Sequence, residues 1–358
     1  MSGMDDFLII GGGIAGLSAG ARLSALGSVT LLEAEDALGY HTSGRSAALY
    51  EPSYGAPPVV ALNEASGDFF FSTEGMLTPR GLLIVGMAGE EDAFAHDAAA
   101  LKARPLDIDE ARALVPVLDP DKVIMAAYHK EAWDIDTDRL LQLFAREIRG
   151  HGGRVLTGQA VTAIVRTGDG WRVTTATGTF EARHLVNAAG AWADRVAQMA
   201  GVAPIGITPY RRSMARVAAP EGVNHWPMIF GPGESWYAKP DAGALLVSPA
   251  DETPVEPHDA WADDLTLAEG IAAYQARVTA PVTRMLANWA GLRSFAPDRA
   301  LVIGPDPSDS SFLWNAGQGG YGFQTAPAAS QLLADLVGGG ASPLPDAMRA
   351  ALSPARFS

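Results

Sequence analysis

Three glycines and a glutamate near the start of the chain have the types and the spacing of a nucleotide-binding turn. Gly11, Gly13 and Gly16 form a GxGxxG motif, and Glu33 follows Gly11 by 22 positions. The first glycine permits a tight turn, the second lets backbone N–H groups approach a pyrophosphate, and the third lets a helix pack closely with its positive N-terminus at the phosphates. An acid at about this distance accepts hydrogen bonds from ribose hydroxyls. These four residues predict a dinucleotide site.

The elements around the motif must form a βαβ unit to position it. The apolar runs Phe7–Ile10 and Val29–Leu32 predict two buried strands of a parallel sheet. The small residues of Ile14–Leu26 predict the helix between them, and Glu33 comes directly after the second strand. Strand, helix and terminal acid together meet the structural context that the motif requires.

The composition is that of a globular protein that folds by burying apolar residues. The chain has 358 residues, which predicts two lobes, and 48% of them are hydrophobic. The net charge of -15, with no run of Lys or Arg, disfavours nucleic acid and anionic membranes as partners. The acidic start and the lack of a long apolar run predict a cytoplasmic protein without an integral membrane segment.

The absence of cysteine narrows the chemistry. Without thiols the chain has no disulfide, iron–sulfur cluster, thiolate metal site or cysteine nucleophile. The seven histidines show no ligand spacing, so no metal is expected. The string DIDTD (134–138) is similar to the start of a calcium loop, but Arg139 stands where that loop requires glycine. Any redox chemistry must therefore come from a bound organic cofactor.

The rest of the chain mixes helix and strand signals. Asp136 or Thr137 caps an amphipathic helix that ends at a glycine stop, and GDG between Val165 and Trp171 predicts a hairpin. HLVNAAG predicts a further buried strand, and FLWNAGQGGYGFQT predicts a strand, a glycine turn and a helix near the end. The middle has many strand-like pieces and one predicted helix near Leu265–Leu286, which indicates a second lobe.

Glycine-rich clusters far apart in the sequence favour a flavin protein over an NAD protein. The strings GYHTSGRSAA, LVNAAGAW, RRS, WPM, SPA, WAGLRSF and QGGYG occur in this order. Over nearly the whole chain they resemble the D-amino-acid dehydrogenases of the D-amino-acid oxidase-like flavoprotein superfamily, and the group around D-arginine dehydrogenase most of all. The resemblance implies non-covalently bound FAD.

The resemblance also implies the fold class, which is α/β with an α+β second lobe. A Rossmann-like FAD-binding domain would be assembled from residues 1–50, 137–205 and 291–358, and a mixed-sheet substrate-binding domain from residues 51–136 and 206–290. The residues that would contact the cofactor are Gly11, Gly13, Ile14, Ala15, Gly16, Glu33, Thr42, Ser43, Gly44, Arg45, Ser46, Ala47, Ala48, Val161, Gly190, Trp192, Gly319, Gly320, Tyr321, Gly322 and Gln324. Among them, the hydroxyls of Ser43 and Ser46 would act as donors, and Glu33 would hold the adenosine ribose.

An arginine would hold the substrate. Arg293 of GLRSF resembles the arginine that binds the substrate carboxylate, a task for which its planar fork of donors is suited. Arg211 or Arg212 would assist it, and the sequence does not choose between them. The hydroxyls of Tyr54 and Tyr237 would contribute as well. The remaining candidates are Gln324 for catalysis and Leu49, Glu51, Leu82, Gly320 and Tyr321 for the substrate pocket.

The activity that the resemblance implies is FAD-dependent oxidative deamination of D-amino acids to 2-oxo acid and ammonia, by hydride transfer from Cα to flavin N5. Leu49 and Leu82 stand where D-arginine dehydrogenase has a histidine and a glutamate. A buried guanidinium would therefore lack a partner, so apolar or aromatic side chains are the expected substrates. Glu51 is expected to be a solvated surface carboxylate, although it could replace a polar contact.

Several alternatives stay open at this point. The same fold could oxidise N-methyl or cyclic secondary amino acids, or a 2-hydroxy acid. A flavin-free binding module and an NAD(P)-dependent dehydrogenase are readings from other classes. The sequence also leaves open the electron acceptor, the stereochemistry and the oligomeric state.

Overall fold

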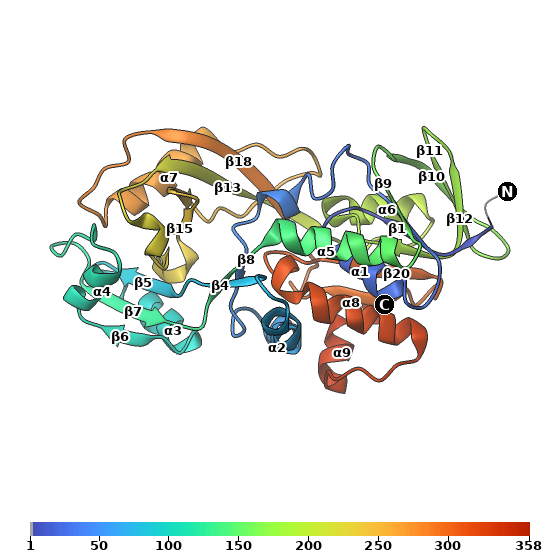
Figure 1. Cartoon of the computed structure of the whole chain (residues 1–358), viewed down its shortest axis with the longest axis horizontal. Helices are drawn as coiled ribbons and strands as arrows, with labels where there is room; N and C mark the ends of the chain where they lie inside the picture. Colours follow the sequence, from blue (N-terminus) through green and yellow to red (C-terminus); the bar gives the residue numbers. More distant parts are fainter. Residues whose placement is uncertain (1–2) are drawn as a thin grey trace.

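Two large β-sheets lie toward opposite ends of the long axis in the computed structural model, which describes residues 3–358 (Figure 1). The first sheet has a parallel centre, in which β1 pairs with β12 and β2, β2 with β9, and β12 with β20. These strands are β1 (Asp5–Ile10), β2 (Val29–Leu32), β9 (Arg154–Leu156), β12 (Thr179–Asn187) and β20 (Phe312–Ala316). The α/β fold class and the parallel βαβ opening are confirmed.

Antiparallel strands extend the first sheet. The predicted GDG hairpin is confirmed: β10 (Val161–Arg166) pairs with β11 (Trp171–Thr175), and β11 pairs with β12. Farther along the same side of β12, β20 is followed by β19 (Val302–Pro305), which pairs with it in antiparallel direction. Every residue of β2 is buried, as the continuous apolar run predicts for a strand covered on both faces.

Helices cover the first sheet and form its main core. They are α1 (Ile14–Leu23), α2 (Pro57–Ser72), α5 (Thr137–Gly150), α6 (Ala193–Met199), α8 (Gly322–Gly338) and α9 (Asp346–Leu352). The N-cap of α5 is Asp136, whose carboxylate accepts from the N–H of Arg139 at 2.9 Å. The first helix ends at Leu23, three residues before the expected Leu26, because the chain closes into a turn there.

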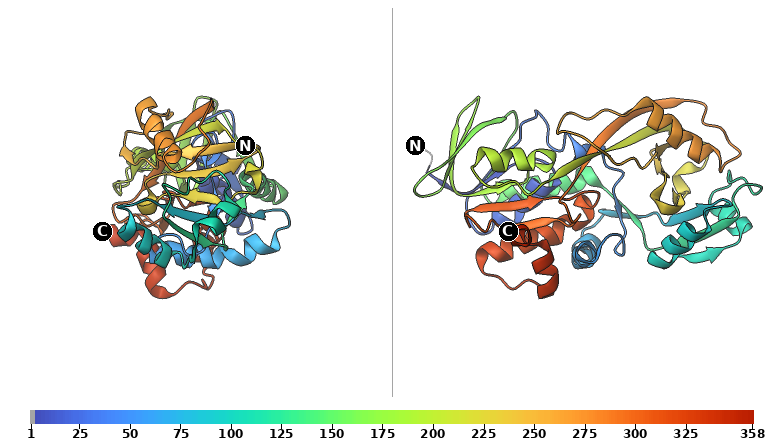
Figure 2. Two further views of the ribbon diagram at one scale, coloured as in Figure 1. Left: turned by 90° about the vertical axis from the view of Figure 1, so that its left-hand side faces the viewer. Right: turned by 180° about the vertical axis from the view of Figure 1, so that it is seen from behind.

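The second sheet is mixed. It contains β5 (Leu82–Gly86), β6 (Arg104–Leu106), β7 (Met125–His129), β13 (Thr208–Ala218), β14 (Met228–Phe230), β15 (Tyr237–Asp241), β16 (Ala244–Ser248), β17 (Thr253–Pro254) and β18 (Met285–Phe295). Around it lie α3 (Glu91–Ala100), α4 (Ile108–Leu114) and α7 (Asp264–Gln275). The long pair β13 and β18 runs from this lobe toward the first one, seen from the front in Figure 1 and from behind in Figure 2.

The predicted helix Leu265–Leu286 is wrong in its second half. The helix α7 ends at Gln275, and Met285 begins β18. Pro281 lacks an N–H for a helical hydrogen bond and disfavours helical geometry in the residue before it. The side chain of Gln275 instead accepts from the N–H of Val282 at 2.8 Å, which fixes the chain as it leaves the helix.

A small third sheet lies between the lobes. It consists of β3 (Leu49–Tyr50), β4 (Leu77–Pro79) and β8 (Trp133–Ile135). Although α2 belongs to the range expected for the substrate lobe, it packs on α8 in the core of the first sheet. Strand β18 stays in the second sheet as far as Phe295, past residue 291. Within residues 3–358 no helix is both long and apolar enough to cross a bilayer.

Candidate active site

A cavity of about 530 Å³ is lined by residues of both lobes. Of the residues expected from the sequence, it is lined by Gly11, Gly13, Ile14, Ala15, Glu33, Thr42, Ser43, Arg45, Ser46, Ala47, Ala48, Leu49, Glu51, Tyr54, Leu82, Val161, Gly190, Trp192, Arg212, Tyr237, Arg293, Gly319, Gly320, Gly322 and Gln324. Gly16, Gly44, Arg211 and Tyr321 are not among its lining residues. Residues that lie up to more than 300 positions apart in the sequence therefore line the same cavity.

The glycine turn at one end of the cavity has room only for backbone. A Cβ on Gly11, which has a φ of +111°, would lie 2.4 Å from the carbonyl oxygen of Ala188. A Cβ on Gly16 would lie 1.9 Å from the carbonyl oxygen of Gly11. Gly16 thus acts behind the cavity wall, where it lets α1 approach the turn. The result is a helix N-terminus with exposed backbone donors, which fits the pyrophosphate of a dinucleotide.

Glu33 lines the cavity beside this turn and is already anchored. Its Oε2 accepts from the N–H of Gly12 at 2.6 Å, and its Oε1 accepts from the N–H of Glu35 at 2.9 Å. Each carboxylate oxygen has a further lone pair for another donor. The carboxylate therefore stabilises the turn and still presents acceptors to the cavity, as a ribose diol requires.

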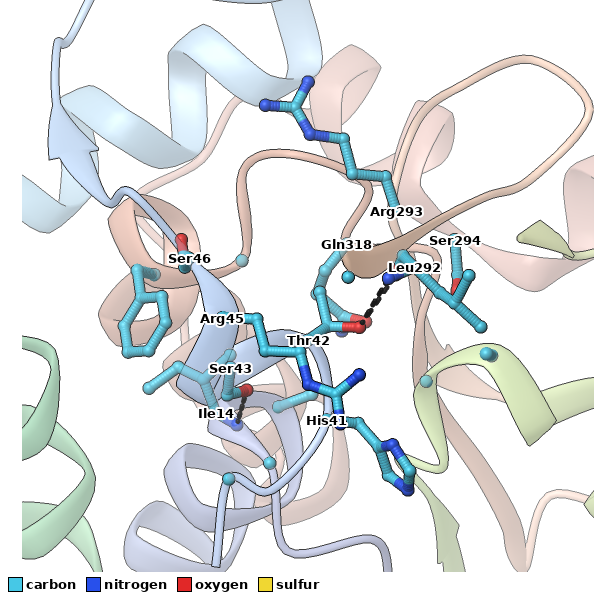
Figure 3. Close-up of a pocket in the computed structure, with 18 of the residues that line it drawn as sticks. Ile14, His41, Thr42, Ser43, Arg45, Ser46, Leu292, Arg293, Ser294 and Gln318 are labelled. Carbon is cyan, nitrogen blue, oxygen red and sulfur yellow. Dashed lines mark hydrogen bonds between the residues drawn. The ribbon is translucent and has the colours of Figure 1, made fainter. Parts of the chain in front are cut away.

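The segment 41–48 is held by its own side chains. The hydroxyl of Thr42 donates to the carbonyl of Leu292 at 2.9 Å and accepts from its N–H at 3.2 Å (Figure 3). The hydroxyl of Ser43 accepts from the N–H of Ile14 at 3.0 Å, at the start of α1 (Figure 3). Ser46 accepts from the N–H of Ala48 at 3.1 Å. These serines therefore first act as acceptors within the protein, and each keeps one proton to donate.

Lys239 is a functional candidate that the sequence reasoning missed. It is 8% exposed and donates to the carbonyl oxygens of Ala47 and Ala48, while its Nζ lies 2.9 Å from a carboxylate oxygen of Asp134. Two of its three donors therefore fix the carbonyls of the cofactor segment. Lys239 stands two residues after Tyr237, so its nearness to an expected site residue was the available signal.

Arg293 lies at the other end of the cavity. Figure 3 shows its side chain extending away from the segment His41–Ser46. Among residues 3–358 its guanidinium has no ion-pair or hydrogen-bond partner, and its Cζ would be 2.9 Å from a Cβ on Gly320. Burial lowers the pKa of Arg293, but its tyrosine and carboxylate neighbours raise it by more. The site thus holds a half-buried cation without a counter-ion.

The structure distinguishes Arg211 from Arg212. Arg211 lies outside the cavity lining, and its Nε contacts Asp251 at 3.1 Å. Arg212 lines the cavity, but it donates to the backbone carbonyl of Asp251 at 2.9 Å and to Glu252 at 3.2 Å. Both guanidinium groups are therefore engaged, in contrast to Arg293.

Tyr54 is hydrogen-bonded to a carboxylate that sequence reasoning did not identify. Its hydroxyl donates to Oε1 of Glu234 at 2.7 Å, and its ring lies 5.5 Å from that of Tyr321. Burial and the Glu234 carboxylate raise the pKa of Tyr54 well above its usual value, so the hydroxyl stays protonated. Glu234 lines the cavity and stands three positions before Tyr237, which was the signal for it.

Glu51 is buried, which corrects the expectation of a solvated carboxylate. It is 3% exposed, and its Oε1 lies 3.2 Å from Nε2 of His129. Its backbone N–H donates to the side chain of Gln324 at 3.2 Å, and Gln324 lies in the first turn of α8. The partner His129 is 78 residues away in the sequence, which is why the pair could not be expected from it.

The two lobes share one cavity, which has a dinucleotide turn at one end and an unpaired arginine at the other. This arrangement is typical of an oxidoreductase that uses a bound organic cofactor. Residues 6–336 match the family model described as DAO, FAD dependent oxidoreductase, so the chain belongs to this family and its cofactor is FAD. The flavin-free and NAD(P)-dependent readings are thereby excluded.

Known relatives cover the whole chain. It is 27% identical to the glycine oxidase of Pseudomonas putida, over 95% of this chain and 96% of that protein. Its fold is similar to that of L-proline dehydrogenase from P. horikoshii, with a TM-score of 0.86, 22% identity and 100% and 98% of the two chains covered. Glycine oxidase from Geobacillus kaustophilus has a TM-score of 0.81 at 22% identity, with 96% of each chain covered.

Proposed function

We propose that the protein oxidises D-amino acids with apolar or aromatic side chains to 2-oxo acids and ammonia. The observation that carries this proposal is the unpaired guanidinium of Arg293 inside a cavity of an FAD dependent oxidoreductase. A half-buried cation without a partner is only partly hydrated, so a ligand carboxylate is its natural counter-ion. The first lobe would bind FAD and the second would supply most of the substrate pocket.

Apolar side chains from the second sheet, from β3 and from the end of α3 line one part of the cavity. They are Leu49, Leu82, Leu101, Met214, Met228 and Phe230. A cationic or strongly polar substrate side chain would lose its hydration there without gaining a partner. An aliphatic or aromatic side chain would be stabilised by about 25 cal/mol for each Å² of apolar surface removed from water.

The chain's own residues would bind and orient the substrate. Arg293 would take the carboxylate, with the hydroxyls of Tyr54 and Tyr237 beside it, and the apolar lining would displace water from the substrate side chain. Bound FAD supplies the two-electron acceptor for the oxidation. The imino acid product then hydrolyses to the 2-oxo acid and ammonia. Because Tyr54 stays protonated, it is a donor and cannot be the base that takes the ammonium proton.

Loss of the ammonium proton before oxidation predicts the pH dependence. The value of kcat/KM should rise with pH as more substrate carries an unprotonated amine, whereas a flat profile through the alkaline range would contradict this step.

A second candidate is the oxidation of glycine, N-methyl or cyclic secondary amino acids. Its support is the glycine oxidase relative, which aligns over 95% of this chain, together with the fold likeness to L-proline dehydrogenase. These substrates share the carboxylate and the amine with D-amino acids, so Arg293 suits both candidates.

Anaerobic flavin bleaching across a substrate panel separates the candidates. The panel contains D-, L- and N-methyl amino acids, proline and 2-hydroxy acids. We expect D-leucine, D-methionine or D-phenylalanine to bleach the flavin fastest. A higher kcat/KM for D-arginine than for these three would contradict the proposed side-chain preference, and bleaching by sarcosine or proline alone would favour the second candidate.

A further inference from the structure

One carboxylate oxygen of a residue that lines the cavity has no partner. Glu51 follows β3 and is 3% exposed. Its Oε1 accepts from the N–H of Ser53 at 3.0 Å and lies 3.2 Å from Nε2 of His129. Its Oε2 is buried and makes no hydrogen bond within the described part of the chain, residues 3–358. A buried carboxylate oxygen left without a donor costs free energy, so a ligand that supplies one would be favoured.

The second partner of Glu51 fixes which oxygen is free. Nε2 of His129 lies 3.0 Å from the carbonyl oxygen of Glu131 as well as 3.2 Å from Glu51. A carbonyl oxygen only accepts, so Nε2 must carry the proton and donate to both groups. The imidazole therefore holds Oε1, and Oε2 is the oxygen left without a donor on a residue that lines the cavity.

Glu51 and Arg293 border the same short turn. The N–H of Glu51 donates to Gln324, while the guanidinium of Arg293 lies against Gly320, four residues earlier. Tyr54 lies near both residues. Its N–H donates to the carbonyl of Glu51 at 3.2 Å, and it is one of the tyrosine neighbours that raise the pKa of Arg293. An unpaired carboxylate oxygen and an unpaired guanidinium thus belong to two residues that line one cavity. An amino acid carries the two complementary groups, an ammonium or amine and a carboxylate.

We propose that Oε2 of Glu51 accepts a hydrogen bond from the amino group of the substrate while Arg293 binds its carboxylate. This inference rests on the proposed function and narrows it, since it assigns the site to acids that carry an N–H group. A 2-hydroxy acid offers one O–H donor and no positive charge, so it would gain less from the carboxylate. A carboxylic acid with neither an amino nor a hydroxyl group at C2 would leave Oε2 unpaired.

The test compares Glu51→Gln with the wild-type holoenzyme for two ligands that differ only in the amine. D-Leucine has it, and 4-methylpentanoate lacks it and cannot be oxidised at Cα in the same way. Glutamine keeps the size of the side chain and removes the charge. We expect kcat/KM for D-leucine to fall about 10²-fold, as when a buried polar contact is lost, and the Kd of 4-methylpentanoate, read from the flavin absorbance change, to stay within about threefold.

Glu234→Gln is the matched control. Its carboxylate lines the same cavity, but Oε1 is occupied by the hydroxyl of Tyr54. We expect kcat/KM for D-leucine and the Kd of 4-methylpentanoate to keep the same relation to each other in this variant as in the wild type. An equal change of this relation in both variants would overturn the inference, because the cause would then be the general charge of the cavity.

Three further results would overturn the role of Glu51. They are an unchanged D-leucine reaction, equal weakening of both ligands, and a changed flavin spectrum or loss of FAD before any ligand is added. The last result would mean that Oε2 serves the cofactor. If D-leucine fails to reduce the wild-type flavin, its Kd is measured directly by the same absorbance change. Failure of the proposed function and failure of this inference are therefore separate outcomes.

Discussion

The two ends of the cavity are built from different materials. The nucleotide end is built mainly from backbone, which is the glycine turn, the N-terminus of α1 and the carbonyls of Ala47 and Ala48 that Lys239 holds, with the carboxylate of Glu33 beside the turn. The substrate end consists of side chains, with the free groups of Arg293 and Glu51 among apolar residues. The first end can bind its ligand only where a Cβ is absent, and the second only where certain side chains are present.

The difference determines what a substitution does. At the nucleotide end an added methyl group displaces backbone, so the whole ligand is affected. At the substrate end a changed side chain alters one contact and leaves the rest of the cavity in place. We therefore expect cofactor retention to respond at the first end and substrate selectivity at the second.

Gly16→Ala should have the largest effect. Its Cβ would lie 1.9 Å from the carbonyl oxygen of Gly11, and backbone there has no room to move without opening the turn. Such overpacking costs about 1–3 kcal/mol or more, and we expect most of the FAD to be lost on purification. The measurement is the flavin-to-protein absorbance ratio.

Gly20→Ala tests whether this effect belongs to the turn. The residue lies in the same helix, but its Cβ would meet side chains rather than backbone, with Cδ1 of Ile148 at 2.7 Å and Cδ1 of Ile9 at 3.1 Å. The variant should keep its flavin. Equal flavin loss in both variants would show that α1 is simply intolerant of alanine.

Arg293→Met should have the second-largest effect. Removing the guanidinium eliminates a desolvated, charge-assisted contact with the substrate carboxylate, and we expect kcat/KM to fall about 10³-fold. FAD content should not change, because the arginine lies away from the nucleotide end. Arg211→Met, whose guanidinium contacts Asp251 outside the cavity lining, should stay within about threefold. Similar losses in both variants would contradict the assignment.

The sequence predicts the nucleotide end well because that end depends on local order. A turn, the helix after it and the acid at the end of the next strand lie within 30 residues, and each has its own signal. The family resemblance to FAD-dependent proteins is confirmed, whereas the D-amino-acid specificity remains a proposal. The contacts of Glu51 with His129 and of Tyr54 with Glu234 join segments far apart in the chain, so neither periodicity nor spacing predicts these pairs, although Glu51 was a candidate and Glu234 lies near Tyr237.

Leu82→Glu should alter the selectivity between substrates more than it alters FAD binding. Leu82 is 5% exposed and belongs to the apolar part of the cavity lining. A carboxylate there would offer a partner to a basic side chain and expose an apolar one to charge. We expect the kcat/KM ratio of D-arginine to D-leucine to rise about tenfold, with the flavin content unchanged. Leu82→Met, which conserves volume, should leave the ratio as it is; an equal shift in both would argue against the apolar wall as its origin.

His129→Gln should give the smallest effect, and one that depends on pH. The hydrogen bond to Glu51 raises the pKa of His129 above its usual value near 6.5, against the opposing effect of burial, with Glu131 adding to the increase. A raised folded-state pKa means that the stabilisation is fully present below about pH 6.5 and is lost as the pH rises through the raised value. A charge-assisted hydrogen bond of this kind contributes about 1–2 kcal/mol. The difference in Tm between wild type and variant should therefore be larger at pH 6 than at pH 9.

His96→Gln, which removes an exposed histidine on α3, should match the wild type at both pH values. A wild-type advantage that grows toward pH 9 would mean that His129 is neutral in the folded protein and that Oε1 of Glu51 is held without a charged partner.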